Sequence, residues 1–333
     1  MRSAPPIRLG IAIFVAYLVC HWTFDGVVEL FWGFPATEQP AWRSDLWWPD
    51  LVNAALIGFI PAALRFARIG IERDLESLHP RMSGSDAELS ALREEFTGPG
   101  GWSTRAANLC GIPIGIGLTY LDPSISHAAE RSLSDPLFLW ALLRTSIFVW
   151  LVMHLINTDF RTTRLYFLLG RDHMIVDLLD DHSLAPLAQR GQRSVLTWAL
   201  FSSLFSLFWL GDSAAQANVI LLVLALMVAT IAYFVPLQAV RKKILAAKQL
   251  ELDRLRAEIR IESRSLNTES EEARDTSPRL ANLVSYYQLI DAASEWPIDA
   301  TNIVRLALYL VLGVGSWLGA AFVERLVDGI LSG

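Results

Sequence analysis

The sequence has few cysteines and none of the short motifs that mark common enzymes. Cys20 and Cys110 form no CxxC pair, so neither a disulfide framework nor a zinc ribbon is predicted. No HExxH, no G-x-S-x-G and no nucleotide-binding fingerprint occurs. We therefore expect neither an enzymatic activity nor a cofactor.

Basic charge is also scarce. The chain has 28 Lys and Arg residues against 34 Asp and Glu, for a formal net charge of -6. A nucleic-acid-binding protein would present a basic face, so nucleic acid is not an expected partner. Lysine occurs only at Lys242, Lys243 and Lys248, and we interpret this preference for arginine as a sign of a bacterial, GC-rich genome.

Long uncharged apolar runs are what the sequence has in excess. It is 53% hydrophobic, with 12 Trp and 16 Phe, and its mean hydropathy is +0.37. Uncharged runs of about 20 residues are typical of helices that cross a membrane. The sequence therefore predicts an all-α, polytopic membrane helix bundle with about seven spans. The expected spans are Ile7–Phe24, Leu51–Ala67, Ala106–Leu121, Leu137–Asn157, Val195–Leu210, Gln216–Val235 and Leu306–Val323.

The distribution of basic residues predicts the orientation of these spans. Alternating crossings place three of the 28 basic residues outside (Arg43, Arg131, Arg325), one within a span (Arg144) and the other 24 inside. Basic residues collect on the cytoplasmic side of membrane proteins. We therefore expect a multi-pass protein of the inner membrane, with a cytoplasmic N-terminus and an outer C-terminus.

Residues 238–294, between the bundle of residues 1–237 and the last part at 295–333, are expected to form a cytoplasmic antiparallel helical hairpin. Apolar residues recur every seven positions in its first half, at Leu245, Leu252, Ile259 and Leu266. Ser277 and Pro278 are a good start for the second helix. Pro236 is expected to bend the helix at the membrane exit. The range Leu245–Ile290 is the expected docking site for a cytoplasmic partner.

A short surface helix is predicted between the second and third spans. Ser85 and Glu88 form a capping-box pattern, which predicts a helix running through Phe96. The following Gly98–Gly101 is rich in glycine but lacks the Lys-Ser/Thr of a phosphate-binding loop.

The third span is rich in glycine, with Gly111, Gly115 and Gly117 around Pro113. Such residues are tolerated in membranes where neighbouring helices satisfy the backbone. Two interpretations remain open: a kinked, tightly packed span, or a broken or re-entrant helix that lines a path.

Arg144 is the most costly residue of the fourth span, because a charge at mid-membrane costs about 2.5–3.5 kcal/mol. Either it is paired with backbone carbonyls or a nearby acid, or it contacts an anion or lipid phosphate or lies in a pore. His154 and Asn157, three residues apart on the same span, could polarise a path for protons or could simply pack.

His173, Asp177 and Asp181 would stand four apart on one face of a helix. Imidazole and carboxylate groups at this spacing can hold a divalent metal. The alternative is a helix lying on the membrane surface with its apolar side down. In the last span, Gly315 and Gly319 would allow close helix packing.

Two functions remain as hypotheses. The first is an oligomeric channel or transporter for a small solute or ion, which rests on the glycine-rich third span and on Arg144. The second is a membrane-anchored sensor or scaffold that acts through its cytoplasmic hairpin. Membrane lipid and further copies of the chain are the expected partners in either case.

Overall fold

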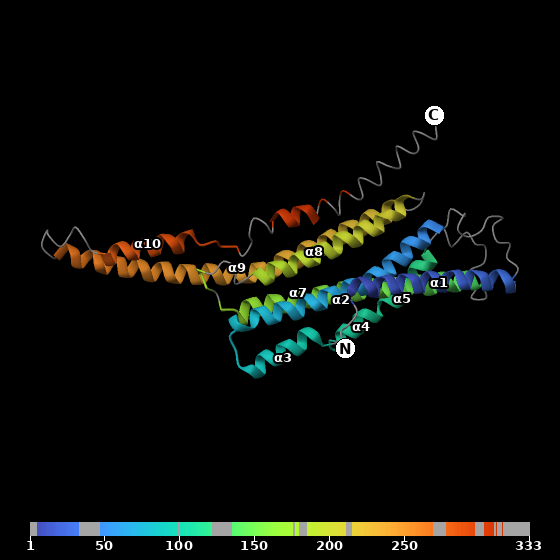
Figure 1. Ribbon diagram of the computed structural model, residues 1–333, viewed down its shortest axis with the longest axis horizontal. Helices are drawn as coiled ribbons and strands as arrows, with labels where there is room; N and C mark the ends of the chain where they lie inside the picture. Colours follow the sequence, from blue (N-terminus) through green and yellow to red (C-terminus); the bar gives the residue numbers. More distant parts are fainter. Residues whose placement is uncertain are drawn as a thin grey trace, which may run out of the picture.

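The computed structural model describes residues 5–32, 47–98, 100–121, 135–175, 177–179, 185–210, 215–268, 278–296, 303–309, 311 and 315. Over these residues the chain is helical and forms no strand beyond one isolated bridge between Met82 and Met174. The predicted all-α class is confirmed. Figure 1 shows an elongated molecule, with a helix bundle at one end and a two-helix hairpin at the other.

The helices have the following bounds. They are α1 (Pro6–Trp32), α2 (Trp47–Leu78), α3 (Asp86–Thr97), α4 (Trp102–Leu109), α5 (Gly111–Leu121), α7 (Pro136–Leu168), α8 (Ala185–Ser206), α9 (Ala215–Thr268) and α10 (Pro278–Ala292). Three short turns extend them, at η2 (His79–Arg81), η3 (Leu169–His173) and η4 (Leu207–Leu210).

Three helical stretches of the described chain are long and apolar enough to cross a membrane. They are Pro6–Val28, Trp48–Arg81 and Pro136–His173. In all three, most side chains of the most apolar part are not buried within the chain. This is consistent with association of the protein with a membrane.

The third predicted span consists of two short helices, α4 and α5, separated only by Cys110. Gly111 lies against Trp150 and Gly115 against Ser146. The pair α4–α5 therefore runs antiparallel along α7, and α5 alone is about 16 Å long, shorter than a hydrocarbon core of about 30 Å.

Contacts give the directions of the other helices. The pairs Asp50–Arg144 and Asp74–Tyr166 join α2 to α7, so these two helices are parallel. Arg193 of α8 contacts Asp74 near the end of α2 that lies far from Asp50, whereas the turn η4 after α8 contacts the start of α2. Helix α8 is therefore antiparallel to α2.

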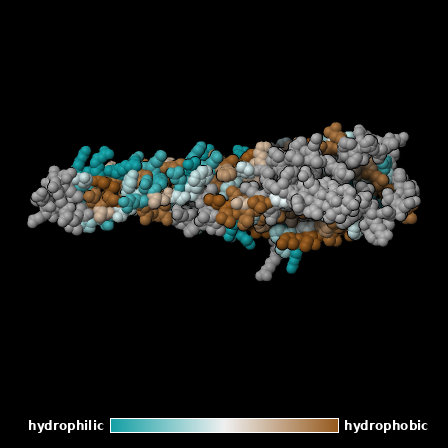
Figure 2. All heavy atoms as spheres, turned by 90° about the horizontal axis from the view of Figure 1, so that it is seen from above, coloured by the Kyte–Doolittle hydropathy of each residue, from teal (hydrophilic) through white to brown (hydrophobic). Residues whose placement is uncertain are grey.

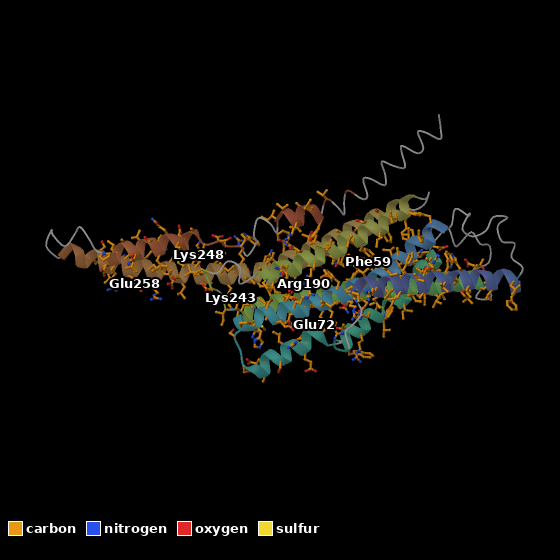
Figure 3. The ribbon with its side chains drawn as sticks, viewed as in Figure 1. Phe59, Glu72, Arg190, Lys243, Lys248 and Glu258 are labelled. Atoms are coloured by element: carbon orange, nitrogen blue, oxygen red, sulfur yellow. The ribbon has the colours of Figure 1, made fainter. Side chains whose placement is uncertain are left out.

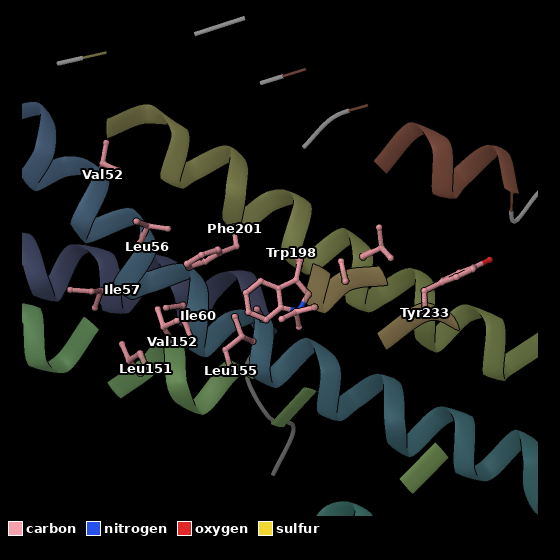
Figure 4. Packing of buried hydrophobic residues seen from close by; sticks show 14 of the residues in the cluster. Val52, Leu56, Ile57, Ile60, Leu151, Val152, Leu155, Trp198, Phe201 and Tyr233 are labelled. Atoms are coloured by element: carbon pink, nitrogen blue, oxygen red, sulfur yellow. The ribbon is translucent and has the colours of Figure 1, made fainter. Parts of the chain in front are cut away.

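The main core lies between α2, α7, α8 and α9 and is apolar. Leu56, Ile60, Phe201 and Leu237 are fully buried in it, and Trp198 and Phe201 pack edge to face. Figure 4 shows Leu56, Ile60, Trp198 and Phe201 in the space between the helices. A second cluster, around Tyr166, joins the C-terminal parts of α2 and α7, the start of α8 and the middle of α9 to α3.

Several helices are longer than the predicted spans. Helix α7 continues to Leu168 and not only to Asn157, and α8 begins at Ala185 and not at Val195. The apolar runs end where charged residues begin. The helices continue because those charged residues pair with one another across the bundle.

Helix α9 passes from the bundle into the hairpin as one helix of 54 residues, with Pro236 inside it. Helix α10 returns antiparallel to its second half, since Arg279 pairs with Glu262 and Lys248 binds the carbonyl of Asp291. Figure 1 shows the hairpin extending away from the bundle, so Pro236 does not fold it back beneath the bundle.

Candidate functional site

The structure contains two clusters of charged side chains, one near each end of the bundle. We call them the outer and the inner cluster, after the orientation expected from the sequence. The outer cluster is Tyr17, His21, Asp25, Asp50, Trp140 and Arg144. The inner cluster is Asp74, Asp159, Tyr166, Arg190, Arg193, Ser194 and Trp198. The apolar core separates them.

Arg144 belongs to the outer cluster and is paired. Its guanidinium donates to Asp50 Oδ1 at 2.7 Å, while His21 Nε2 contacts Asp50 Oδ2 at 2.8 Å. Asp25 lies 3.6 Å from the same histidine nitrogen. Since Asp50 precedes the second predicted span, Arg144 lies near the outer end of the bundle and not at its middle. Of the two interpretations of Arg144, the one in which it pairs with a nearby acid agrees with this geometry.

Aromatic rings surround this outer cluster. Trp140 stacks on His21 with centroids 5.7 Å apart and on Phe24 at 4.8 Å. Three buried polar atoms on these rings, Tyr17 Oη, His21 Nδ1 and Trp140 Nε1, have no hydrogen-bond partner among the described residues. Such atoms generally require water or another polar group, so this end of the bundle can take up water.

The inner cluster is centred on Asp159 and Arg190. Arg190 is 5% exposed and donates to Asp159 Oδ1 at 2.8 Å. Ser194 and Trp198 both donate to Asp159 Oδ2, at 2.7 and 3.0 Å. These three donors all lie on α8, so the Asp159 carboxylate fixes α8 against α7.

A second pair extends the inner cluster towards the hairpin. Asp74, which is 3% exposed, pairs with Arg193 and accepts a hydrogen bond from Tyr166 at 2.6 Å. Arg193 lies over Gly70, where an added Cβ would be 2.6 Å from its Nε. A side chain at Gly70 would displace the arginine from its acid.

A cavity of about 40 Å³ lies beside these pairs, between α2, α7 and α8. Its polar walls include Asp159, Arg190, Arg193, Ser194 and Thr197, and its apolar walls come from α2, from Leu155 of α7 and from Trp198 of α8. One water molecule needs roughly 10–15 Å³, so the cavity has room for about three. The arrangement can hold a small, hydrated polar species. Figure 3 shows Arg190 within the bundle, far from Lys248 and Glu258 of the hairpin.

His154 and Asn157 are joined to α4, not to Arg144. His154 Nδ1 contacts Asn108 Nδ2 at 2.6 Å, and Asn157 donates to Asn108 Oδ1 at 2.8 Å and to the carbonyl of Thr104 at 3.0 Å. These hydrogen bonds are partly buried, and they hold α4 against α7. Along α7, Arg144 and His154 are about 15 Å apart.

Two of the three glycines of α5 pack closely against α7, as the interpretation of a tightly packed span predicts. Added Cβ atoms at Gly111 and Gly115 would lie 2.6 and 2.5 Å from the Cα atoms of Trp150 and Ser146. An added Cβ at Gly117 would have no atom of the described residues within 4 Å. Gly111 and Gly115 therefore permit close contact between α5 and α7.

A helix was predicted through the candidate metal ligands His173, Asp177 and Asp181, and this prediction is wrong for the residues that directly follow His173. The chain leaves the helix after His173, and Met174 is extended because its backbone pairs with Met82. Asp177 instead accepts from the backbone N–H of Leu179, and Asp181 lies outside the described residues. The residues that the structure describes contain no group of three potential metal ligands.

The last predicted packing pair is Gly315 and Gly319. Among the described residues no atom lies within 4 Å of an added Cβ at Gly315, and Gly319 lies outside the described part of the chain.

The inner cluster was not predicted from the sequence. Its four charged residues lie outside the apolar runs: Asp74, Asp159, Arg190 and Arg193. Charged residues at such positions are expected at the cytoplasmic ends of spans, so their positions alone did not mark them as a site. One signal was present: charged residues follow the second and fourth expected spans and precede the fifth, so acids and bases recur at ends that alternating crossings place on one side. No protein-family model, curated protein or solved structure matches this chain.

Proposed function

We propose that the protein is a membrane-anchored sensor or scaffold, in which a seven-span bundle sets the position of a cytoplasmic helical hairpin. The observation that carries this proposal is α9, a single helix of 54 residues that belongs to both parts. A continuous helix transmits displacement along its length, whereas a flexible linker does not. A shift of α9 within the bundle would therefore move the hairpin.

The bundle holds α9 at three levels, which supports a coupling role. Arg190 donates to the carbonyl of Ala232 at 3.2 Å. Gly170 lies against Val240, where an added Cβ would be 2.7 Å from the valine side chain. Lys243 donates to the carbonyl of Met174 at 2.6 Å. A change in the inner cluster would thus reach α9 directly.

The helix directions support seven alternating spans. Helices α1 and α2 are antiparallel, since Gly10 lies against Gly58 and His21 beside Asp50. Helices α2 and α7 are parallel, and α4–α5 and α8 run in the opposite direction. These are the directions that alternating crossings require. The pair α4–α5 follows the whole fourth span and so reaches the same depth.

The spacing of the two charged clusters supports their placement at the two membrane surfaces. Along α7, Arg144 and Asp159 are about 22 Å apart, and along α2, Asp50 and Asp74 are about 36 Å apart. These values bracket a hydrocarbon thickness of about 30 Å. Trp22 near the outer level and Trp102 near the inner level are 60% and 79% exposed, as expected of interfacial tryptophans.

The side chains on the surface fit this placement. Figure 2 shows hydrophilic side chains gathered over the hairpin, whereas hydrophobic ones predominate among the coloured residues of the bundle. Together with the excess of basic residues on the hairpin side, this favours a cytoplasmic hairpin in the inner membrane of a bacterium.

Coupling can be tested by the distance between bundle and hairpin. Spin labels at Arg105→Cys and Leu250→Cys, with Cys20→Ser and Cys110→Ser, would report it in full-length protein in lipid nanodiscs. Arg190→Gln should shift or broaden the distance distribution, because it releases Ala232. The control Arg68→Gln, which removes only an exposed pair with Glu72, should leave it unchanged.

A second variant makes the test independent of bundle stability. Replacing Ala246 and Ala247 by glycine softens α9 between bundle and hairpin. It should broaden the same distribution while the bundle unfolds at an unchanged temperature. Distributions that coincide for wild type, Arg190→Gln and the glycine variant would refute the coupling.

A channel or transporter for a small solute or ion is the second candidate, favoured by the polar cavity beside Asp159. Within one chain, the apolar core closes the way between the two clusters, so this function would need an oligomer or a rearranged bundle. Flux through reconstituted liposomes that is abolished by Arg144→Leu and retained after deletion of residues 245–290 would favour it over the sensor.

A further inference from the structure

The cavity beside the inner cluster is elongated along the helices. Ala63 and Ile71 of α2 both line it, and they lie about 12 Å apart along the helix. On α8 the same interval separates Arg190 from Trp198, which also line it. Since α8 is antiparallel to α2, Ala63 and Trp198 lie at one end of the cavity, and Ile71 and Arg190 lie at the other.

One end of the cavity is apolar and the other is charged. Leu155 of α7 joins Ala63 and Trp198 at the apolar end, and Figure 4 shows Leu155 and Trp198 close together there. Arg190 and Arg193 lie towards the other end, within the inner cluster. In the proposed orientation the charged end is at the cytoplasmic surface of the membrane, and the apolar end points into the bilayer.

Arg193 has hydrogen-bond donors that the described chain does not use. An arginine carries five N–H groups. One nitrogen of Arg193, Nη2, donates to an acceptor among the described residues, a carboxylate oxygen of Asp74. The Arg193 side chain is 21% exposed, so its other N–H groups are within reach of a ligand. The planar fork of a guanidinium matches the oxygens of a phosphate or a carboxylate.

The charges of the cavity wall favour an anion. Oδ1 of Asp159 accepts from Arg190, and Oδ2 accepts from Ser194 and Trp198, so both oxygens of the only lining acid are engaged. Two arginines and one aspartate line the cavity, which gives its wall a net positive charge. A cation would meet these guanidinium groups, whereas an anion would be bound by them.

The size of the cavity selects a small group. Its volume of about 40 Å³ holds about three water molecules, which corresponds to the terminal oxygens of a phosphate group. The lining residues Leu64, Thr158 and Thr197 are partly exposed, so the cavity opens to the surface of the bundle. Basic pockets between membrane helices on the cytoplasmic side are typical binding sites for anionic lipid headgroups.

We infer that this cavity binds a phosphate group, with Arg193 as its donor and Arg190 as a fixed positive charge beside it. The phosphate belongs either to the headgroup of an anionic lipid or to inorganic phosphate from the cytoplasm, since both present the same oxygens. The inference goes beyond the proposed function, because binding in this cavity does not require α9 to transmit a displacement.

Two probes separate the two sources of phosphate. Radiolabelled inorganic phosphate is titrated against full-length protein in nanodiscs of phosphatidylcholine. Phosphatidylglycerol is added to full-length protein in detergent, and retained lipid is detected by native mass spectrometry. Wild type should bind at least one probe in a saturable manner. Binding of phosphatidylglycerol alone identifies a lipid site, and binding of phosphate alone identifies a site for the free ion. If both bind, each should displace the other.

Two variants test the cavity in different ways. Arg193→Gln removes the donor and should weaken binding about tenfold or more, as expected when a charged hydrogen-bond donor is lost. Ala67→Leu fills the cavity from α2 without changing a charge, and it should weaken binding at least as much. Arg68→Gln is the matched control, because it removes a neighbouring charge whose pair with Glu72 is exposed. It should bind like wild type.

Wild type that binds neither probe would overturn the inference. Ala67→Leu that binds like wild type would overturn it as well, because the phosphate would then be held outside the cavity. Binding and coupling can fail separately. The two probes report occupancy of the cavity, whereas the distance between Arg105→Cys and Leu250→Cys reports only the coupling of the bundle to the hairpin.

Discussion

At Gly115 the backbone of α5 touches that of α7 so closely that no side chain fits. An added Cβ would lie 2.5 Å from Ser146 Cα, which is backbone and cannot move aside alone. We expect Gly115→Ala to separate the two helices and to cost about 1–3 kcal/mol of stability. Thermal unfolding in detergent, followed by tryptophan fluorescence, measures it.

Gly117 is the matched control, because it lies two residues away in the same helix and an added Cβ there meets no described atom within 4 Å. Alanine is a better helix former than glycine by about 1 kcal/mol, so Gly117→Ala should be neutral or stabilising. Equal effects of the two substitutions would show that α5 does not pack on α7 in this way.

Asp159 and Arg190 form the most buried ion pair of the described chain. Removing one partner leaves a buried charge uncompensated, and Asp159→Leu should cost about 3–5 kcal/mol. In Asp159→Leu/Arg190→Leu no charge is left alone, so the double variant should be more stable than either single one. Titration of unfolding with a denaturing detergent compares the three. A double variant that loses the sum of the single losses would contradict the pairing.

Why the sequence did not indicate this pair is a matter of separation along the chain. Asp159 and Arg190 lie on different helices, 31 positions apart, and Asp74 and Arg193 are 119 positions apart. Periodicity reports which face of one helix a residue occupies, but not which residue of another helix it meets. Arg144 was conspicuous because it interrupts an apolar run, whereas Asp159 follows one.

Among the elements, α3 shows local sequence determining local structure. The predicted capping box is confirmed: Ser85 Oγ accepts from the Glu88 N–H, and Glu88 accepts from the Ser85 N–H. The hydrogen bond from the Ser85 backbone holds the pKa of Glu88 below its usual range. A lowered pKa contributes stability above the ordinary value of this group, and that contribution is lost as the pH falls through the lowered pKa.

Acidification should therefore loosen the first turn of α3. We expect amide hydrogen exchange at residues 86–90 to become several-fold faster, relative to unstructured reference peptides, below about pH 4. Glu88→Gln should remove most of this pH dependence, and Ser85→Ala should raise exchange at neutral pH as well. If amide protection in the first turn changes neither with pH nor with Ser85→Ala, then packing of Phe96, and not the cap, holds the helix.

The long helices show where local patterns stop being sufficient. Apolar runs located α1, α2 and the first part of α7, because a crossing helix needs uncharged surface on every side. They could not predict that α7 continues to Leu168, since that extension depends on Tyr166 meeting Asp74 on α2. The failed helix after His173 has the same origin, because Met174 is held extended by Met82, 92 positions earlier.

For the whole molecule, the relation between bundle and hairpin depends on which side of the membrane each occupies. The proposed seven crossings would put the N-terminus and hairpin on one side and the C-terminus on the other. In inverted membrane vesicles, a membrane-impermeant maleimide should label Leu250→Cys at once, because this side chain is 75% exposed on the hairpin. Intact spheroplasts should protect it. The background carries Cys20→Ser and Cys110→Ser.

A C-terminal tag should show the opposite pattern, with cleavage by protease in intact spheroplasts and protection in inverted vesicles. This contrast does not depend on α4 and α5, because a single span separates the hairpin from the C-terminus. The side on which the N-terminus lies relative to the hairpin does depend on that pair, so an N-terminal tag tests whether it crosses. If α4–α5 turns back within the membrane, an N-terminal tag will be exposed outside while the hairpin stays inside. If the pair crosses, N-terminal tag and Leu250→Cys will be accessible from the same side, as its course along the whole of the fourth span leads us to expect.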